Sequence, residues 1–368
     1  MTKRKTTRRD FFRGSAARDA IAGRLDGVAS EPVSTGGDPG SPDVGVLRVG
    51  RKAMAAEFEL FFNAGQYPEA TEAALAALDE VDRIEEQLSY FRATSEVSRI
   101  NQLAQSEPLP IDADLFELLE LAARLHGETD GALDITAGPL SEVWGFARRK
   151  GTIPTNEQLD EARSRVGSDK LELNSNGQTA RLGVPGMRIN LGAIGKGYAL
   201  DRSAAILAER GIEDFLMHGG QSSVVARGSR GNPGFAPNRG EPTGWTVGVH
   251  DPTRHGRRLA EIRLCNRALA TSSSEKQFFR HQGRRYSHIL DPRTGQPAEG
   301  LVSATVVAPS AVLADGLSTA LFVLGADHAL TFCEARPELA VLLVRAEGSQ
   351  IEVLSSGFTP GELEILGL

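Results

Sequence analysis

The sequence predicts an α+β fold in which mixed, largely antiparallel sheets pack against helices. Three observations lead to this prediction. Helical and strand-like segments follow one another without the regular alternation of a doubly wound parallel sheet. Several short apolar runs alternate with polar residues, which is typical of antiparallel strands with one solvated face. No internal repeat period is apparent.

Apolar residues recur at helical spacing in four segments. These segments are residues 68–88, 112–126, 197–209 and 311–324. Asp112 is expected to cap the N-terminus of the second segment, and Gly127 is expected to cap its C-terminus. The third segment should stop at Gly211.

Short apolar runs between these segments predict strands. The runs are residues 58–62, 215–217, 223–226, 245–249, 259–264, 301–307 and 340–344. A chain of 368 residues suffices for one large domain or two intimately packed ones. We expect the folded region to start near Val46 and to form one compact domain, residues 46–368, with two closely associated halves.

Residues 1–45 are expected to form a leader and a linker outside the folded domain. The run from Arg8 to Gly14 (RRDFFRG) resembles a twin-arginine export signal, which needs an apolar stretch after it. That stretch contains four charges here, at Arg18, Asp19, Arg24 and Asp26. A disordered basic leader is the alternative. The sequence favours a cytoplasmic location slightly, with export as the other possibility.

Composition narrows the function classes. With 40% hydrophobic and 24% charged residues, the chain falls within the range of ordinary globular proteins. Its net charge of −7 argues against a nucleic-acid partner. No apolar run is long enough to cross a bilayer. The two cysteines, Cys265 and Cys333, have no metal-ligand spacing, and two buried free thiols are expected rather than a disulfide.

A glycine-rich stretch, residues 192–197 (GAIGKG), leads into the third helical segment. Its spacing matches neither the dinucleotide nor the P-loop fingerprint. Glycines let backbone N–H groups approach a phosphate, and the following helix presents its positive end. Lys196 would add a point charge. A tight strand-to-helix turn, with Lys196 on a solvated surface, is the alternative.

Asp315 and Thr319 lie one turn apart on the same face of the last helical segment. A carboxylate and a hydroxyl at this spacing suit a hard cation such as Mg²⁺, which prefers oxygen ligands and phosphate co-ligands. Alternatively, Asp315 caps a helix and Thr319 faces a neighbouring strand.

Two further segments could carry chemistry. His288 stands at the end of a probable strand, before a turn over residues 291–295, and could act as a general base near neutral pH. It could equally be a packing residue. Residues 131–140 contain small side chains that would permit close approach to a ligand, or would simply make a turn before the aromatic pair of Trp144 and Phe146.

The order of these segments along the chain resembles the FAD:protein FMN transferase family, also called the ApbE family. The resemblance covers roughly residues 54–325. The segments that carry it are Ser89-Tyr90-Phe91, Ser95-Glu96, Asn101, residues 131–140 (GALDITAGPL), Trp144-Gly145-Phe146, residues 189–201 (INLGAIGKGYALD), Gly219-Gly220, Thr271-Ser272, residues 288–295 (HILDPRTG) and residues 314–325 (ADGLSTALFVLG).

The resemblance implies an ApbE/T-fold-like architecture and a specific reaction. In this family FAD lies in a cleft with Mg²⁺ at its pyrophosphate, a Ser or Thr of an acceptor protein attacks the FMN phosphorus, and AMP leaves. Asp315, Thr319 and the carbonyl of Ala193 would be the metal ligands, and His288 the base. Lys196 would assist at the pyrophosphate. The flavin and adenosine site would be lined by Met54, Phe91, Ala132, Leu133, Asp134, Asn190, Lys196 and Ile289.

Several positions depart from the family's pattern. Asn190 and Gln221 stand where it has aspartates, and Phe91 replaces a tyrosine. Leu133 stands for Phe or Met, and Ser273 for Gly. Two other activities share the same site residues: a metal-dependent FAD pyrophosphatase, in which water replaces the acceptor hydroxyl, and a non-catalytic flavin-binding protein.

Overall fold

The computed structural model describes residues 45–366, apart from 149, 232–243, 255, 276 and 348–349. The leader and linker expected over residues 1–45 lie almost entirely outside this range, so their boundary, the export motif and the cellular location stay predictions. Residues 44–368 form one compact unit. No helix in the described part of the chain is long and apolar enough to cross a membrane.

An eight-stranded sheet runs through the centre of this unit, and every neighbouring pair in it is antiparallel. In order across the sheet, the strands are β1 (Val46–Ala53), β2 (Ala56–Asn63), β6 (Phe215–Gly219), β7 (Ser223–Arg227), β10 (Arg267–Ser273), β13 (Ser303–Ala308), β14 (Ala340–Glu347) and β15 (Gln350–Ser356). The predicted α+β class with antiparallel sheets is confirmed.

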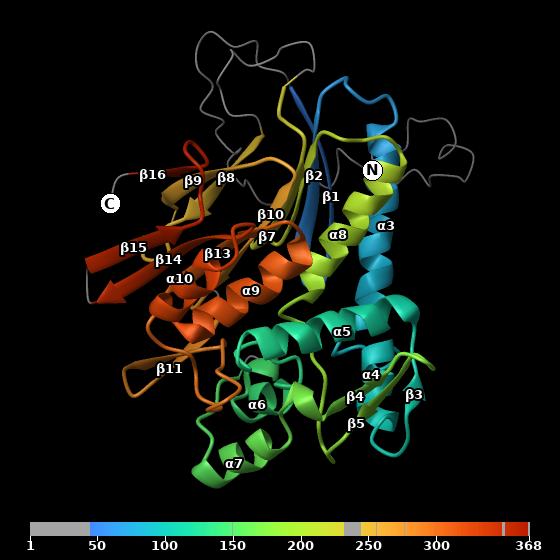
Figure 1. Ribbon diagram of the computed structural model, residues 1–368, viewed down its shortest axis with the longest axis vertical. Coiled ribbons are helices and arrows are strands. Elements are labelled where there is room, and N and C mark those ends of the chain that lie inside the picture. The colour runs from blue at the N-terminus through green and yellow to red at the C-terminus, as the bar shows by residue number, and fades with distance from the viewer. Residues whose placement is uncertain are drawn as a thin grey trace, which may run out of the picture. The chain divides into compact units, whose positions relative to one another are not determined.

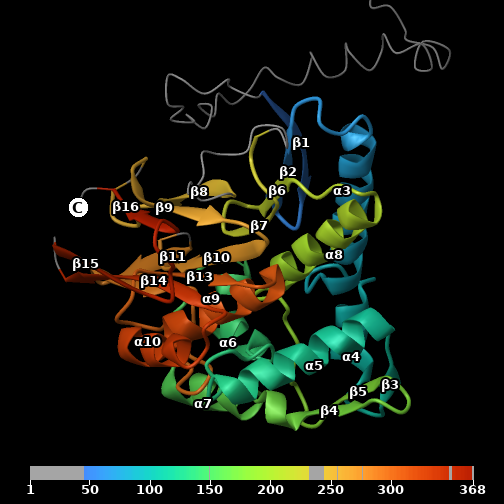
Figure 2. The ribbon, with the colours of Figure 1, turned by 45° about the horizontal axis from the view of Figure 1, so that its top comes forward.

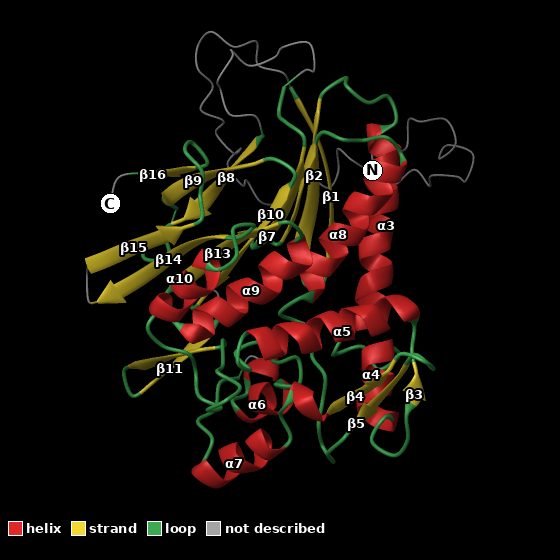
Figure 3. Cartoon of the chain, in the orientation of Figure 1, coloured by secondary structure: helices red, strands yellow, loops and turns green. Residues whose placement is uncertain are grey.

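Helices cover one face of the sheet (Figures 1 and 3). They are α3 (Ala70–Leu88), α8 (Gly195–Glu209), α9 (Ala311–Leu324) and α10 (Ala326–Glu334). Alternation along β2 explains this layer, because Phe58, Leu60 and Phe62 all point toward the helices and are completely buried. The exposed Leu75 shows that α3 turns only one side to the core.

A smaller sheet covers the other face (Figure 2). Its strands are β8 (Trp245–His250), β9 (Arg258–Leu264) and β16 (Leu363–Ile365), with β9 in the middle. Val224 and Leu269 of the large sheet pack there against Trp245 and Ile262, and these residues form a second core that is separate from the helical one.

The remaining elements lie at one end of α3 and α8. They comprise α4 (Glu96–Leu103), α5 (Ala113–Glu128), α6 (Gly138–Val143), α7 (Asn156–Ser164), the short helices η1 (Phe146–Arg148) and η2 (Ser168–Lys170), and a small sheet of β3 (Leu109–Pro110), β5 (Thr179–Leu182) and β4 (Leu171–Asn174). The hairpin of β11 (Phe278–His281) and β12 (Arg284–Ser287) extends from the same end.

The four predicted helices and seven predicted strands all form, with ends that move by a few residues. Asp112 caps α5 as predicted, since its Oδ1 accepts from the backbone N of Asp114 at 3.0 Å. The prediction that Gly127 caps the other end is wrong, because the helix continues to Glu128. There the Thr129 hydroxyl donates to the carbonyl of Leu125 at 2.7 Å.

Both cysteines are free thiols, as predicted. Cys333 is buried in the helical core, whereas Cys265 is only half-buried, so the prediction of two buried thiols holds for one of them. Burial raises the pKa of the Cys333 thiol to about 11.

Candidate active site

The candidate site forms where helices α8 and α9 cross with almost no side chain between them. A Cβ on Gly197 would lie 2.2 Å from the carbonyl oxygen of Ala311, so only glycine allows this approach. Asp201 completes the contact, because its two carboxylate oxygens accept from the backbone N–H groups of Ala311 and Val312, each at 2.8 Å. This carboxylate therefore sits at the positive end of α9.

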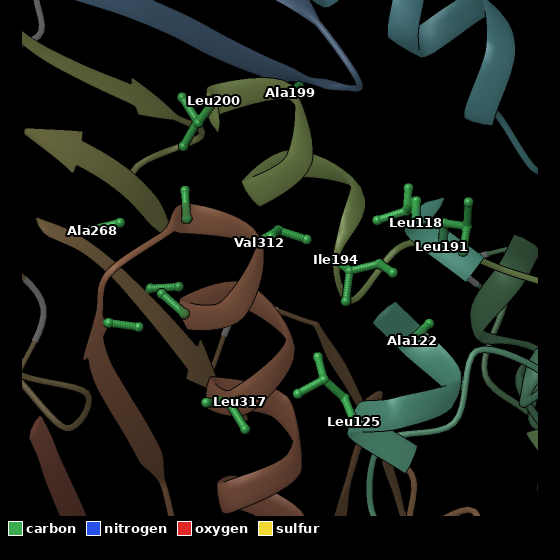
Figure 4. Packing of buried hydrophobic residues seen from close by; sticks show 14 of the residues in the cluster. Leu118, Ala122, Leu125, Leu191, Ile194, Ala199, Leu200, Ala268, Val312 and Leu317 are labelled. Carbon is green, nitrogen blue, oxygen red and sulfur yellow. The ribbon is translucent and has the colours of Figure 1, made fainter. Parts of the chain in front are cut away.

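Buried apolar side chains fill the space around this crossing (Figure 4). Ile194, in the turn before α8, packs in this space with Leu317 of α9 and Leu125 of α5. A Cβ on Gly316 would lie 3.1 Å from the Cγ2 atom of Ile194, so α9 is also tightly packed on this side. The glycine-rich turn is thus held between two helices, and its position relative to α9 is fixed by packing.

Asp315 lies on α9 at this crossing and is held by three donors, two from α8 and one from β7. Its Oδ2 accepts from the backbone N of Gly197 at 3.0 Å, and its Oδ1 accepts from the Ser223 hydroxyl at 3.0 Å. The Nζ of Lys196 is 3.5 Å from Oδ1. Only 8% of the Asp315 side chain is exposed, so these partners offset the cost of burying its charge.

The helix-cap interpretation of Asp315 is wrong. The N-cap of α9 is Ser310, whose hydroxyl accepts from the backbone N of Leu313, and Asp315 lies further inside the helix. A carboxylate in a buried helix interior needs a specific partner, and the partners found here are a glycine-turn N–H, a hydroxyl and a lysine.

Hydroxyl groups surround Thr319, one turn after Asp315. Its Oγ1 is 3.1 Å from the Ser272 hydroxyl of β10, which is also 2.9 Å from the hydroxyl of Ser318. The Ser318 hydroxyl in turn donates to the main-chain carbonyl of Asp315 at 2.9 Å. A carboxylate and several neutral oxygens are therefore available on one side of α9.

This donor set fits Mg²⁺, which takes few protein ligands and keeps positions for water and phosphate oxygens. Within the described residues no group of three or more His, Cys, Asp or Glu side chains could hold a metal ion. A cation here would therefore depend on Asp315, on neutral oxygens such as Thr319 Oγ1, and on ligand oxygens. The carbonyl of Ala193, in the turn before α8, stays a predicted third ligand.

Asn190 shapes the glycine-rich turn. Its Oδ1 accepts from the backbone N of Gly192 at 3.0 Å, and its own backbone N donates to the carbonyl of Ile135 at 2.7 Å. An aspartate would accept the first bond in the same way. The departure from the family's aspartate therefore keeps the turn and removes one negative charge.

Asp201 and Asn101 make structural contacts around the site that sequence reasoning did not assign to them. The amide of Asn101 pairs with both the backbone N and the carbonyl of Ile189, at 2.7 and 2.9 Å. Burial raises the pKa of Asp201, and the nearby charge of Asp315 also raises it. The hydrogen bonds from the N–H groups of Ala311 and Val312 lower it, but the net shift is upward. Asn101 and Asp201 both lie in the quoted segments, but Ser223 lies in none, so no local signal marked it.

His288 comes directly after β12, at the base of the β11–β12 hairpin. The carbonyl of Gln277 lies 2.9 Å from its Nδ1 and also accepts from its backbone N at 3.1 Å. Because a carbonyl can only accept, Nδ1 carries a proton in this contact, and in the uncharged form of the ring the lone pair would lie on Nε2. The following Ile289 is buried.

The turn after His288 is tied to the segment around Trp144. The indole N–H of Trp144 donates to the carbonyl of Gly295 at 2.8 Å, across 151 residues of sequence. Within the turn, Gly295 N donates to the carbonyl of Asp291 at 2.7 Å. Trp144 therefore anchors the loop that begins with His288.

The segment from Gly131 onward contributes buried side chains. Ala132 and Leu133 belong to the core. The Asp134 carboxylate accepts from Ser168 Oγ at 2.7 Å and from Thr136 N at 2.8 Å, so it stabilises two loops. If these residues contact a ligand, as predicted, they must do so mainly through backbone atoms.

A cavity of about 250 Å³ lies beside this segment. Its lining brings α5, α7 and the turn after His288 together and consists of His126, Gly131, Asp134, Arg163, Val166, Gly167, Pro292 and Arg293. The two guanidinium groups already have partners. Arg163 donates to the carbonyl of Arg293 at 2.9 Å, and Arg293 pairs with Asp291.

The two remaining predicted ligand contacts lie on separate elements. Met54 follows β1 in the left-handed region, with a φ of 49°, and its backbone N donates to Glu85 Oε2 at 2.8 Å. Phe91 follows α3 and is 73% exposed, an unusual state for a phenylalanine. Its ring makes an edge contact with Tyr90 and leaves most of its surface accessible to a planar ligand.

The fold and these contacts define a class of site. A glycine turn at a helix N-terminus offers backbone N–H groups and Lys196 to an anion. Beside it, Asp315 and the hydroxyls offer oxygen ligands to a divalent cation. Such a pair of neighbouring sites is suited to a phosphorylated ligand that binds together with Mg²⁺.

The chain belongs to the ApbE family, whose sequence model matches residues 54–343. One relative is the FAD:protein FMN transferase of Haemophilus influenzae, 36% identical over 280 residues that cover 74% of this chain and 78% of the relative. This finding confirms the resemblance drawn from the sequence.

Solved structures agree with this assignment. The ApbE protein of Thermotoga maritima matches with a TM-score of 0.74 and 31% identity, over 84% of this chain and 96% of that one. The flavinyl transferase ApbE of Pseudomonas stutzeri matches with a TM-score of 0.73 and 28% identity, over 85% of this chain and 95% of that one.

Proposed function

We propose that this chain is an FAD:protein FMN transferase, which uses Mg²⁺ and transfers FMN from FAD to a Ser or Thr hydroxyl of an acceptor protein. The observation that carries the proposal is the cluster of Asp315, Lys196 and the Gly197 N–H at the start of α8. It places a lysine, a helix N-terminus and a buried carboxylate within a few ångströms of one another, as a metal-bound pyrophosphate requires.

The cluster's residues bind and orient the substrate. Asp315, Thr319 and the carbonyl of Ala193 would hold Mg²⁺, which when bound supplies positive charge at the pyrophosphate. The half-buried Lys196 is 24% exposed, so it can turn from Asp315 toward a phosphate oxygen. The exposed ring of Phe91 offers a stacking surface for the flavin or the adenine.

His288 serves as the base in this proposal. Because Nδ1 donates to Gln277, Nε2 can accept the proton of the acceptor hydroxyl. The hydroxyl oxygen then forms a bond to the FMN phosphorus, and the bond from that phosphorus to the bridging oxygen breaks. AMP is the leaving group, and the acceptor keeps FMN as a phosphoester.

The structure gives no reason to prefer a purely binding role. Asn190 accepts the hydrogen bond from Gly192 N that an aspartate would accept. Asp315 keeps its hydrogen bond from the Ser223 hydroxyl. Loss of one carboxylate from this turn reduces local negative charge, which favours rather than opposes an anionic substrate.

A direct test supplies the protein with FAD, Mg²⁺ and an extract that contains acceptor proteins. AMP is measured by chromatography, and covalent flavin is measured by fluorescence of the denatured proteins after electrophoresis. We expect both products, and we expect both to disappear with EDTA and in the Asp315→Asn variant. Release of FMN without any labelled protein would indicate a pyrophosphatase. Absence of AMP would indicate a flavin-binding protein.

A further inference from the structure

The β11–β12 hairpin projects from the body of the molecule (Figure 1), and β12 ends at the residue before His288. Its two-residue turn, Gln282 and Gly283, has positive φ at both positions, 49° and 80°, as a tight hairpin turn requires. The strands pair in register from Phe278 opposite Ser287 to His281 opposite Arg284.

One face of the hairpin is anchored by aromatic packing. Phe279 and Tyr286 lie opposite each other and stack, with ring centroids 5.2 Å apart. Phe279 also contacts Phe146 at 5.4 Å, and Tyr286 contacts Trp144 at 5.7 Å. A Cβ on Gly151 would lie 2.5 Å from Phe279, so the base of this packing is tight. Such anchoring lowers the entropy lost when the other face binds a partner.

The outer face presents an aromatic ring between guanidinium groups. Phe278 is 40% exposed, and its ring centroid lies 4.3 Å from Cζ of Arg285 and 5.9 Å from Cζ of Arg280. Exposed aromatic and arginine side chains on a pre-organised element are typical of residues that dominate protein–protein interfaces.

The hairpin is also strongly basic in an acidic chain. Residues 278–287 contain Arg280, Arg284 and Arg285 and no Asp or Glu, whereas the whole chain has a net charge of −7. Arg285, on the outer face, pairs with Glu275. Arg284, at the tip and on the anchored face beside the ring of Tyr286, pairs with Glu299. Arg280 forms no ion pair with any residue that the structure describes, and it is exposed.

The hairpin leads directly into the proposed base. Residues 284–287 form β12, and His288 follows without a gap. At about 3.3 Å per extended residue, Arg284 at the tip lies about 13 Å from His288. A peptide whose hydroxyl reaches His288 could therefore bring a residue about four positions away to the tip.

We propose that the outer face of the β11–β12 hairpin, together with its tip, is the docking surface for the acceptor protein. It selects an extended segment with acidic residues about four positions from the acceptor hydroxyl, through Arg280 on the outer face and Arg284 at the tip, with Phe278 as an apolar contact. The inference rests on the proposed transferase function. FAD is not the occupant, because the cluster of Lys196 and the α8 N-terminus accounts for its charges.

Short peptides with a single central threonine test this proposal. They differ only at positions about four residues from the threonine, which carry Asp and Glu, Asn and Gln, or Lys and Arg. Each peptide is incubated with the full chain, FAD and Mg²⁺. Covalent flavin on the peptide and AMP release are measured in the same reaction, so that the chemistry and the recognition are followed separately.

Charge reversal and its matched control complete the design. The variants are Arg280→Gln, Arg280→Glu and the double variant Arg280→Glu/Arg284→Glu. The control is Arg210→Glu, which reverses an exposed arginine at the opposite end of α8, about 20 Å from Lys196. Neither Arg280 nor Arg284 belongs to the FAD and metal machinery, so the KM for FAD should not change.

The wild type should label the acidic peptides with a kcat/KM about fivefold above the neutral ones, the size expected for one or two exposed charge pairs. Arg280→Gln should remove this preference, and the double variant should prefer the basic peptides. Arg210→Glu should leave the preference intact, and added salt should reduce it.

Three results would overturn the docking proposal while AMP release remains normal: equal labelling of all peptides, an unchanged preference after charge reversal, or no labelling of any peptide. A change in the KM for FAD in Arg280→Glu would assign the hairpin to FAD instead. Absence of AMP in every reaction would refute the proposed transferase function itself.

Discussion

Replacing Asp315 by asparagine removes one negative charge from the cluster and keeps the shape of the side chain. The carboxylate accepts on both oxygens, from Gly197 N and from the Ser223 hydroxyl. The amide has only one acceptor oxygen. Its NH₂ group must therefore face either the Gly197 N–H or the two donors on the other side, Lys196 and Ser223, and those donors lose their acceptor.

The Asp315→Asn change should reduce the catalytic rate strongly but the free energy of unfolding only modestly. Weakening a buried hydrogen bond to a charged acceptor costs about 1–3 kcal/mol, and the partly exposed pair with Lys196 adds at most about 1 kcal/mol. A domain with a free energy of unfolding of about 5–15 kcal/mol remains folded after such a change. Loss of the charged metal ligand should nevertheless reduce the rate by about 10²-fold or more.

The assay measures AMP formation from FAD across a Mg²⁺ titration, alongside urea unfolding of the same samples. Ser223→Ala is the matched control, because it removes a neutral donor to the same carboxylate and keeps the charge. Its activity should fall by at most about tenfold. Turnover near the wild-type rate in Asp315→Asn, with the same Mg²⁺ dependence, would refute the assigned role of this carboxylate.

Three further changes test other parts of the structure. Gly197→Ala places a Cβ 2.2 Å from the carbonyl of Ala311, so urea unfolding should show a loss of several kcal/mol; a loss below about 1 kcal/mol would mean that the helices can separate easily. Burial raises the pKa of Asp201 above its ordinary value of 3.8, so the folded state holds this proton more tightly than the unfolded state. The stability of the wild type should therefore fall as the pH rises from about 4 through the raised pKa, and Asp201→Asn should lack this dependence. Identical pH profiles of the two proteins in urea unfolding would contradict the shift. Phe91→Ala should leave the unfolding free energy within about 0.5 kcal/mol, because the ring is 73% exposed, but should weaken FAD binding in a fluorescence titration; unchanged affinity would exclude stacking on this ring.

Local patterns allowed much of the cluster to be predicted. The spacing of Asp315 and Thr319 identifies one helix face, and the glycines around Lys196 indicate a turn at a helix start. Each feature lies within one short segment, so each can be recognised from the sequence alone. The same holds for the helix boundaries at Asp112 and Gly211, where side-chain or glycine chemistry marks the end.

Features that depend on tertiary packing could not be predicted in this way. Ser223 reaches Asp315 across 92 residues of sequence, from a strand whose pattern indicates only burial. The error at Gly127 has a similar origin. Thr129 makes the closing hydrogen bonds of α5, to the carbonyl of Leu125 and from the backbone N of Leu133, so the helix runs past the glycine. The outward orientation of Phe278 likewise follows from the stacking of its neighbour, Phe279.

The most direct measurement replaces Mg²⁺ by Mn²⁺ and records its phosphorus hyperfine coupling by pulsed electron paramagnetic resonance in the presence of FAD. The proposed site predicts a coupling to the ³¹P nuclei of the pyrophosphate in the wild-type protein and its loss in Asp315→Asn. Protein-bound Mn²⁺ without phosphorus coupling, or the same coupling in the variant, would contradict the placement of a cation between this carboxylate and the substrate.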